Sequence, residues 1–197
     1  MTGRRPTLGE LMTQRPSYLY YTATTLDGFL ADEHDSLDWL LAQPLGSGSL
    51  LDYDSFSAGV GALVMGSTTY QWILDHPQEQ FGDADAWPYD KPAFVFTHRD
   101  LAPAAETVTI LAGAPAEHRE QIEAAAGDGA VWVMGGGDLA AQFARDGMLD
   151  EVMVSIAPVT LGAGRPLLGG RFDLQLQDFG RNEAFLEARY TVVGERP

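Results

Sequence analysis

The chain has 197 residues, with 12 lysines and arginines against 28 aspartates and glutamates, and a formal net charge of −16. An apolar fraction of 45% and a charged fraction of 20% are ordinary for a globular protein and exclude a disordered chain, a collagen or a coiled coil. The chain has no cysteine, so disulfides, cysteine-ligated metals and a catalytic thiol are excluded. Such an acidic surface repels nucleic acid and anionic membranes.

The first residues of the chain are polar. We expect residues 1–16 to form a flexible N-terminal arm, and residues 17–197 to form a single domain. Residues 1–16 lack the apolar segment of a secretory signal. No run approaches the roughly 18 apolar residues that a membrane span requires. These features favour a cytoplasmic protein that has no membrane partner.

In the first half of the chain, short apolar runs alternate with polar segments. Residues 18–25 predict a strand that breaks at Leu26-Asp27-Gly28, followed by a loop over 29–36 and a helical turn over 38–41. Residues 44–49 read as a flexible loop. A short helix is expected over 52–59 with Asp52 as its N-cap. A buried strand over 62–65 ends at Gly66 and leads into a helix over 67–74, capped by Ser67 or Thr68.

The second half continues the alternation after a polar loop over 76–91. Strands are expected at residues 93–97, 107–111, 130–134 and 152–157. Helices are expected over 115–126 and over 138–146, the second ending at Gly147. Residues 174–179 and 185–193 predict a closing antiparallel pair. This alternation indicates an α/β domain with a largely parallel sheet and antiparallel strands at its C-terminal edge.

A run of three glycines is the strongest local signal for a ligand. Gly135, Gly136 and Gly137 follow one apolar strand and precede a helix. Glycines let backbone N–H groups approach a phosphate, and the helix N-terminus adds the positive end of its dipole. A tight turn that needs positive φ is the alternative, but one glycine would satisfy it. The spacing is neither Gly-x-Gly-x-x-Gly nor a Gly-Lys-Ser/Thr loop, so a Rossmann fold and a Walker loop are not indicated.

Two other strand ends carry groups that suit a phosphate. Gly66 is followed by the hydroxyls of residues 67–69, for which simple helix capping is the alternative reading. The strand at 93–97 ends at Thr97-His98-Arg99, where Arg99 could bind a phosphate through two hydrogen bonds or lie in solvent. No His, Asp and Glu cluster has the spacing of metal ligands, so we expect no metal site.

Taken in order, these motifs resemble the dihydrofolate reductase-like superfamily, in the branch typified by the C-terminal reductase domain of the bifunctional riboflavin-biosynthesis protein. The matching stretches are residues 22–28 (TATTLDG), 36–40 (SLDWL), 64–70 (VMGSTTY), 133–137 (VMGGG) and 149–164. The resemblance covers residues 18–193. It implies a three-layer α/β/α fold whose mostly parallel central sheet binds NADPH at the C-terminal ends of its strands.

The resemblance also implies which residues would hold that cofactor. In such relatives the first two glycines of the triple-glycine run can be joined by a cis peptide bond. Ser67 stands where the family carries a basic residue, so NADH remains an alternative to NADPH. The implied cofactor-binding residues are Ala23 and Leu30 beside the nicotinamide, Gly66, Ser67, Thr68 and Thr69 at one phosphate, Phe96, Thr97, His98 and Arg99 at the adenosine, and Gly135, Gly136, Gly137, Asp138 and Leu139 at the pyrophosphate.

The catalytic residues are less defined. Dihydrofolate reductases proper carry an acid a few residues beyond the tryptophan matched by Trp39, and residues 42–49 contain no carboxylate. Asp27 and Asp38 are therefore the candidates for orienting a substrate or relaying a proton. A turn residue and a helix cap are their alternative roles. We expect Trp39, Tyr53 and Phe56 to line the substrate pocket and to stack a flat substrate.

The resulting functional prediction is an NAD(P)H-dependent reductase that transfers hydride to a small flat substrate. One alternative is the riboflavin-pathway 5-amino-6-(5-phosphoribosylamino)uracil reductase. The other is a non-catalytic NADP(H)-binding protein. Residues 27–56 contain seven carboxylates and no Lys or Arg, which favours an unphosphorylated substrate unless a distant arginine such as Arg165 enters the pocket. We also expect a homodimer, because Val152, Val154 and Ile156 would otherwise lie on an exposed sheet edge.

Overall fold

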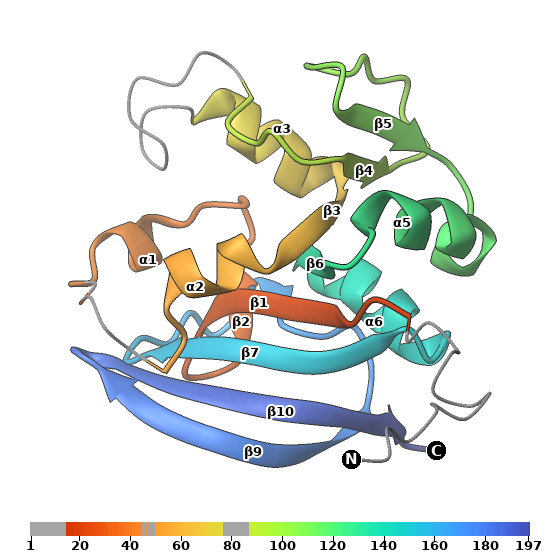
Figure 1. Cartoon of the computed structure of the whole chain (residues 1–197). Helices are drawn as coiled ribbons and strands as arrows, with labels where there is room; N and C mark the ends of the chain where they lie inside the picture. The colour runs from red at the N-terminus through yellow and green to blue at the C-terminus, as the bar shows by residue number, and fades with distance from the viewer. Residues whose placement is uncertain (1–14, 45, 47–49, 77–86) are drawn as a thin grey trace, which may run out of the picture.

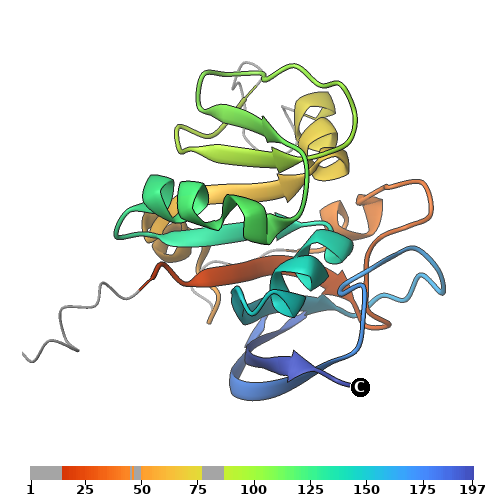
Figure 2. The same cartoon turned by 90° about the vertical axis from the view of Figure 1, so that its right-hand side faces the viewer.

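The computed structural model describes residues 15–44, 46, 50–76 and 87–197. Its centre is an eight-stranded sheet with the order β5-β4-β3-β6-β1-β7-β10-β9, and helices cover both faces (Figures 1 and 2). The sheet strands are β1 (Tyr18–Thr25), β3 (Val60–Gly66), β4 (Ala93–Phe96), β5 (Val108–Leu111), β6 (Ala130–Gly135), β7 (Leu149–Ala157), β9 (Phe172–Asn182) and β10 (Phe185–Glu195). The helices are α1 (Asp38–Leu41), α2 (Tyr53–Ala58), α3 (Ser67–Asp75), the 3-10 helix η1 (Pro115–His118), α5 (Arg119–Ala126) and α6 (Gly137–Arg145).

The strand directions follow the predicted pattern. In the sheet order, each neighbouring pair from β5 to β7 is parallel, whereas β10 is antiparallel to both β7 and β9. A second, two-stranded sheet joins β2 (Phe29–Ala31), which we expected to be part of a loop, to β8 (Arg165–Pro166). This small sheet lies beyond the C-terminal end of β1 and forms one wall of the site described below (Figure 1).

Two apolar layers enclose the central sheet. On one face, Ile122 of α5 and Phe143 of α6 pack on Val64 and Val133, and all four side chains are fully buried. On the other face, the α3 residues Tyr70 and Ile73 pack on β3 and β4. Burial on both faces explains why the central strands are continuous apolar runs rather than alternating ones. The rigid sheet fixes where its strand ends, and hence the site, are placed.

The N-terminal boundary of the domain differs in part from the expectation. Residues 1–14 of the expected arm lie outside the described residues, but Arg15 is attached to the sheet. Its guanidinium donates to both carboxylate oxygens of Asp150, over 2.7 and 2.9 Å, and the same carboxylate accepts from the backbone N–H of Tyr18. Most of the loop expected at residues 44–49, and the middle of the loop at 76–91, also fall outside the described residues.

Strand β7 is not the exposed edge that we expected. It lies between β1 and β10, and its residues Val152 and Val154 are buried. The hydrogen-bonding partners of a strand depend on the order of the whole sheet, which the local apolar pattern of β7 does not encode. The two edges of the sheet are β5 and β9. On β9, Leu176 and Phe179 are exposed, at 50% and 66%.

None of the helices within the described residues has the length and apolar character to span a membrane.

Candidate functional site

Two strand-to-helix junctions meet at the C-terminal edge of the parallel sheet. Strand β3 runs into α3 at Gly66, and its neighbour β6 runs into α6 at Gly136. The two strands pair directly, with Met65 opposite Gly135, so the two helix N-termini lie at the same edge. In an open α/β sheet, this edge is where ligands bind.

Neither helix is capped by a side chain. Gly66 is the N-cap of α3 and Gly136 is the N-cap of α6, and neither helix start has a side-chain cap hydrogen bond. The expected capping of α3 by Ser67 or Thr68 is therefore wrong, because the cap position is one residue earlier, at a glycine. The first backbone N–H groups of both helices are consequently available to an anion, together with the hydroxyls at the start of α3.

The three glycines of the triple-glycine run have different structural roles. Gly135 has φ of +123°, a conformation that side chains disfavour, and its peptide bond to Gly136 is cis, as the resemblance implies. At Gly137 a Cβ atom would collide with the backbone oxygen of Pro166. At Gly136 no atom lies within 4 Å of the position of a Cβ atom, so this residue faces open space. The run thus combines a turn, a close packing contact and an unobstructed stretch of backbone.

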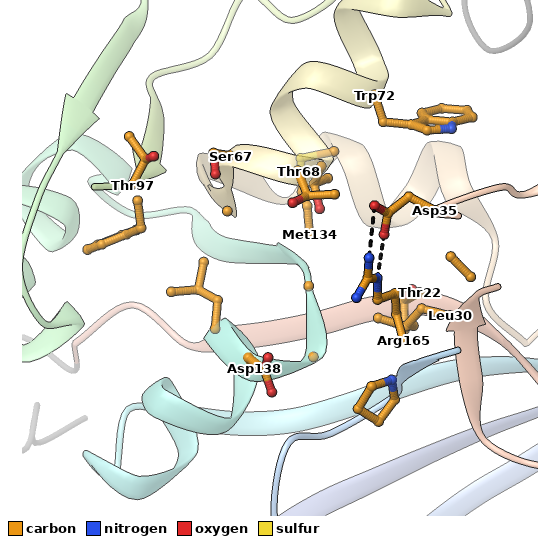
Figure 3. Close-up of a pocket in the computed structure, with 18 of the residues that line it drawn as sticks. Thr22, Leu30, Asp35, Ser67, Thr68, Trp72, Thr97, Met134, Asp138 and Arg165 are labelled. Atoms are coloured by element: carbon orange, nitrogen blue, oxygen red, sulfur yellow. Dashed lines mark hydrogen bonds and ion pairs between the residues drawn. The ribbon is translucent and has the colours of Figure 1, made fainter. Parts of the chain in front are cut away.

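A cavity of about 740 Å³ opens along this edge of the sheet (Figure 3). All of the cofactor residues expected from the sequence line it except Gly135. They come from five segments: Ala23 and Leu30 from β1 and β2, residues 66–69 from the β3–α3 junction, residues 96–99 at the end of β4 and just beyond it, and residues 136–139 at the start of α6. The size is in the range of small-molecule sites.

Arg99 lies at the end of the cavity formed by the segment after β4. Its backbone N–H donates to the hydroxyl of Thr97 over 2.9 Å, which holds the turn after the strand. No hydrogen bond or ion pair of its guanidinium occurs within residues 15–44, 46, 50–76 and 87–197. This charge therefore has no protein partner there and is available for a ligand anion near the hydroxyls of Ser67 and Thr68.

Three aromatic residues that we expected in a substrate pocket lie elsewhere. Phe56 stacks on Tyr21, with ring centroids 4.4 Å apart, and meets Trp132 edge-on. Tyr53 joins the same aromatic cluster, and neither Tyr53 nor Phe56 lines the cavity. Trp39 is buried, with Ala157 and Phe185, in a small core of its own. Their aromatic character serves packing, which a single sequence cannot distinguish from stacking on a ligand.

The two candidate aspartates also lie outside the large cavity. The Asp27 carboxylate accepts from the hydroxyl of Thr25 at 2.6 Å and from the backbone N–H groups of Leu161 and Gly162. These hydrogen bonds, that from Thr25 first, lower the pKa of Asp27 below its ordinary value. Asp38 is exposed and lines a neighbouring cavity of about 430 Å³. Asp27 is thus a turn residue, while the cap of α1 is Leu37 rather than Asp38.

The remaining walls of the cavity come from residues that the sequence did not single out as a set. Trp72 of α3, Leu37 and Leu40 of the α1 segment, and Met134 of β6 contribute apolar surface. Asp35 and Arg165, which also line the cavity, face one another and form an ion pair (Figure 3). Trp72 lies one turn of helix after Thr68, a helical spacing that could have indicated that both face the cavity.

These features fit a dinucleotide. Two helix N-termini without side-chain caps, the hydroxyls of residues 67–69 and the guanidinium of Arg99 line the cavity. The apolar side chains of Ala23, Leu30 and Met134 line the same cavity. Helix N-termini, hydroxyls and a guanidinium suit the phosphates of a dinucleotide, and apolar side chains suit its flat rings. The large cavity has carboxylates only at Asp35 and Asp138 among the residues that line it.

This sheet order, with its ligand edge between β3 and β6 and its antiparallel C-terminal strands, defines a dihydrofolate reductase-like α/β fold. Dihydrofolate reductase from Enterococcus faecalis, solved as a complex with NADP(H) and RAB-propyl, superimposes with a TM-score of 0.55 at 13% identity, over 90% of this chain and 96% of that chain. At that identity the likeness concerns the fold alone.

The chain belongs to the RibD C-terminal domain family, whose model matches residues 16–182. It is similar to a putative riboflavin biosynthesis protein from Shewanella sp. PV-4, with a TM-score of 0.74 and 25% identity over 89% of this chain and 98% of that chain. It is also 30% identical to the uncharacterized protein YwjB of Bacillus subtilis (strain 168), over 75% of this chain and 79% of that protein. This family is reductase-like.

Proposed function

We propose that this protein is an NAD(P)H-dependent oxidoreductase that reduces a small flat organic substrate. The observation that carries the proposal is that one cavity combines two chemically different kinds of lining. Uncapped helix N-termini and Arg99 form lining that suits phosphates. Ala23, Leu30 and Met134 add apolar lining that suits a nicotinamide ring beside a substrate.

Each segment of the cavity then has a task in binding. The N–H groups at the starts of α3 and α6 hold phosphates, and the guanidinium of Arg99 pairs with the 2′-phosphate of NADPH. The apolar side chains from β1, β2 and β6 orient the nicotinamide and exclude water from its reactive face. When bound, the cofactor supplies a hydride, and the protein supplies position and electrostatics.

A second candidate is reduction of 5-amino-6-(5-phosphoribosylamino)uracil. The family and the name of the Shewanella protein favour it. In addition, Arg165 lies in the cavity, where an arginine could meet a substrate phosphate. The ion pair between Arg165 and Asp35 opposes that role, because it already occupies the guanidinium. A non-catalytic NADP(H)-binding protein would share the cofactor end of the cavity.

Two measurements test the proposal. Fluorescence titration with NADPH measures cofactor binding without any substrate. NADPH consumption is then followed with neutral quinones or ketones and, separately, with the phosphoribosylamino-uracil. We expect NADPH binding and turnover of a neutral acceptor. Binding without turnover of any acceptor would favour the non-catalytic alternative, turnover of the phosphorylated compound alone would favour the pyrimidine reductase, and absence of NADPH binding would contradict the proposal.

We further propose that the protein is a homodimer, with β9 in place of β7 as its contact. Strand β9 is a sheet edge, and edges with exposed apolar side chains pair readily with another chain. Leu174, Leu176 and Phe179 are opposite Val192, Tyr190 and Ala188 of β10 in the register, so they share one face of the sheet. Their exposure of 36%, 50% and 66% marks a surface that a second copy can cover.

A further inference from the structure

An ion pair between Asp35 and Arg165 lines the same cavity as Arg99. The guanidinium of Arg165 donates from Nε to one carboxylate oxygen of Asp35 over 2.6 Å and from a terminal nitrogen to the other oxygen over 3.1 Å (Figure 3). Both residues line the cavity. This two-point geometry uses the fork with which an arginine would otherwise bind a phosphate or a carboxylate of a ligand.

The local backbone holds both partners in place. Asp32 accepts from the N–H groups of His34 and Ser36, which forms the turn that presents Asp35. Asp35 itself has φ of +64°, a conformation that aspartate tolerates better than most residues. On the other side, Arg165 pairs with Ala31 in the small sheet of β2 and β8. The fold thus brings two solvent-accessible side chains, 55% exposed for Arg165 and 36% for Asp35, within hydrogen-bonding distance of each other.

Close backbone packing brings β8 against β2. A Cβ atom at Gly164 would collide with the carbonyl oxygen of Ala31, so only glycine permits this approach. Gly164 also has φ of +150°, which reinforces that requirement. The glycine immediately before Arg165 thus allows β8 to lie against β2 at the cavity wall.

The charges near this arginine are mainly negative. The hydrogen bond to Asp35 comes first among the causes that raise the pKa of Arg165, and the negative charges of Asp35, Asp138 and Asp32 add to it. An anionic ligand that displaced Asp35 from Arg165 would meet the displaced carboxylate and the two other aspartates. Like charges at close range oppose binding. Arg99 differs, because no carboxylate within the described residues is paired with its guanidinium.

The surface around the ion pair is apolar. Figure 3 shows Trp72 and Leu30 on two sides of the Asp35–Arg165 pair, and the apolar side chains of Leu37, Leu40 and Pro166 also line the cavity. One face of the Trp72 indole stacks on His76, with ring centroids 4.4 Å apart, which fixes the orientation of the indole. Rigid apolar and aromatic walls suit a flat ligand without charge.

We infer that Asp35 is a specificity-determining residue: by occupying the guanidinium of Arg165 it excludes phosphorylated and other anionic substrates, and restricts the site to flat, uncharged molecules. The inference rests on the proposed reductase function, because it concerns the substrate end of the same cavity. The ion pair with Asp35 prevents Arg165 from binding a phosphate, although Arg165 lies where it could contact the phosphate of a ligand.

A matched pair of probes tests the inference directly. The probes are 1,4-naphthoquinone and 1,4-naphthoquinone-2-sulfonate, which share a flat ring system and differ by one negative charge. The chain has no cysteine, so the quinones have no thiol to alkylate. Binding is measured by isothermal titration calorimetry with and without saturating NADP⁺. We expect the neutral quinone to bind at least about tenfold more tightly than the sulfonate, the factor typical of one charged contact.

Variants then assign the discrimination to one carboxylate. Asp35→Asn should strengthen sulfonate binding about tenfold and leave the neutral quinone within about twofold, because Arg165 becomes free to bind an anion. Asp75→Asn is the matched control: it removes the same charge from the neighbouring cavity, where Asp75 is bonded to Gln71 rather than to Arg165. It should change neither affinity. The double variant Asp35→Asn/Arg165→Met should lose the gain.

Each contrary result overturns the inference. Failure of the neutral quinone to bind, or equal affinities of the wild-type protein for the two probes, contradicts an uncharged substrate class. No gain in Asp35→Asn, or the same gain in Asp75→Asn, shows that Asp35 is not the discriminating group. If Asp35→Asn does not fold, the two wild-type affinities decide alone. The NADPH titration reports separately on the proposed function, so its failure is distinguishable from failure of the specificity inference.

Discussion

At the scale of single residues, the ligands that the cavity can bind depend on which backbone and charged groups its residues leave accessible. Gly136 offers bare backbone at the start of α6, and Arg99 offers its charge after β4. Asp35 has the opposite effect on Arg165, whose charge it neutralises. Two arginines in one cavity therefore have different functions because their immediate neighbours differ.

Replacing Gly136 by valine tests the phosphate end. The backbone at this residue is extended and nothing lies within 4 Å of the position that a Cβ atom would take, so the added side chain projects into the cavity without a clash. We expect loss of NADPH binding in fluorescence titrations, with an unchanged far-UV circular dichroism spectrum. Gly136→Ala adds one methyl group and should cause a smaller loss. Unaltered NADPH affinity in a folded Gly136→Val protein would contradict the assignment of this residue.

Replacing Arg99 by alanine tests how the two cofactors are distinguished. Ser67 cannot supply positive charge at the neighbouring helix start, so Arg99 is the group to pair with a 2′-phosphate. Loss of one charge-assisted hydrogen bond should weaken NADPH binding by about 1.5 kcal/mol, roughly tenfold, and leave NADH binding unchanged. Arg171→Ala, which removes an arginine that does not line the cavity, is the charge control. Equal losses for NADPH and NADH would assign Arg99 another role.

At the scale of elements, the turn after β1 ties two distant segments together. Asp27 accepts from the N–H groups of Leu161 and Gly162, and Leu26 donates its N–H to the carbonyl of Val159. These bonds place the chain between β7 and β8, and with it Gly164 and Arg165, beside β2. The carboxylate that we considered for proton transfer therefore positions the wall of the site.

The pH dependence of unfolding tests this role. The pKa of Asp27 is lower in the folded protein than its ordinary value of 3.8, so ionised Asp27 stabilises the fold above that pH. This stabilisation is lost as the pH falls through the lower, folded-state pKa. We expect urea unfolding to show a constant difference in stability between wild type and Asp27→Asn from pH 7 to about 5, and a shrinking difference below about 4. A difference independent of pH down to 3 would rule out an ionised Asp27 as the cause.

At the scale of the whole molecule, the C-terminal strands extend the sheet beyond the layer that the helices cover. Strand β10 packs against α6 through Ala188, and β9 continues past it as the edge of the sheet (Figure 2). Leu174, Leu176 and Phe179 of β9 are exposed. An apolar strip on an edge strand is unusual for an isolated acidic protein, because it invites pairing. The dimer that we propose would bury this strip away from the cofactor edge.

Light scattering tests the assembly. At micromolar concentration we expect the wild-type protein to have twice the subunit mass, and Phe179→Glu to have the mass of one subunit, because a charge in a buried apolar contact is costly. Leu26→Glu is the matched control: Leu26 is 68% exposed, similar to Phe179 at 66%, but it lies in the turn after β1. It should remain dimeric. A wild-type protein of single-subunit mass would refute the proposal.

Local patterns in the sequence were sufficient for most elements and for the two strand-to-helix junctions that line the cavity. The apolar runs of β3 and β6, each followed by glycine and a helix, place Gly66 and Gly136 at one edge, because parallel neighbouring strands end on the same side of a sheet. Asp52 caps α2 as predicted, through a bond to the N–H of Ser55. Such features depend on residues a few positions apart, which is why a single sequence can show them.

The tertiary structure alone decided which distant side chains meet. Asp35 and Arg165 are 130 positions apart and become partners only because β2 and β8 form a small sheet. The same holds for Phe56, which packs on Tyr21 instead of a ligand, and for β7, which β1 and β10 enclose. Strand order and long-range packing follow from the free energy of the whole fold, and no local pattern of polarity specifies them.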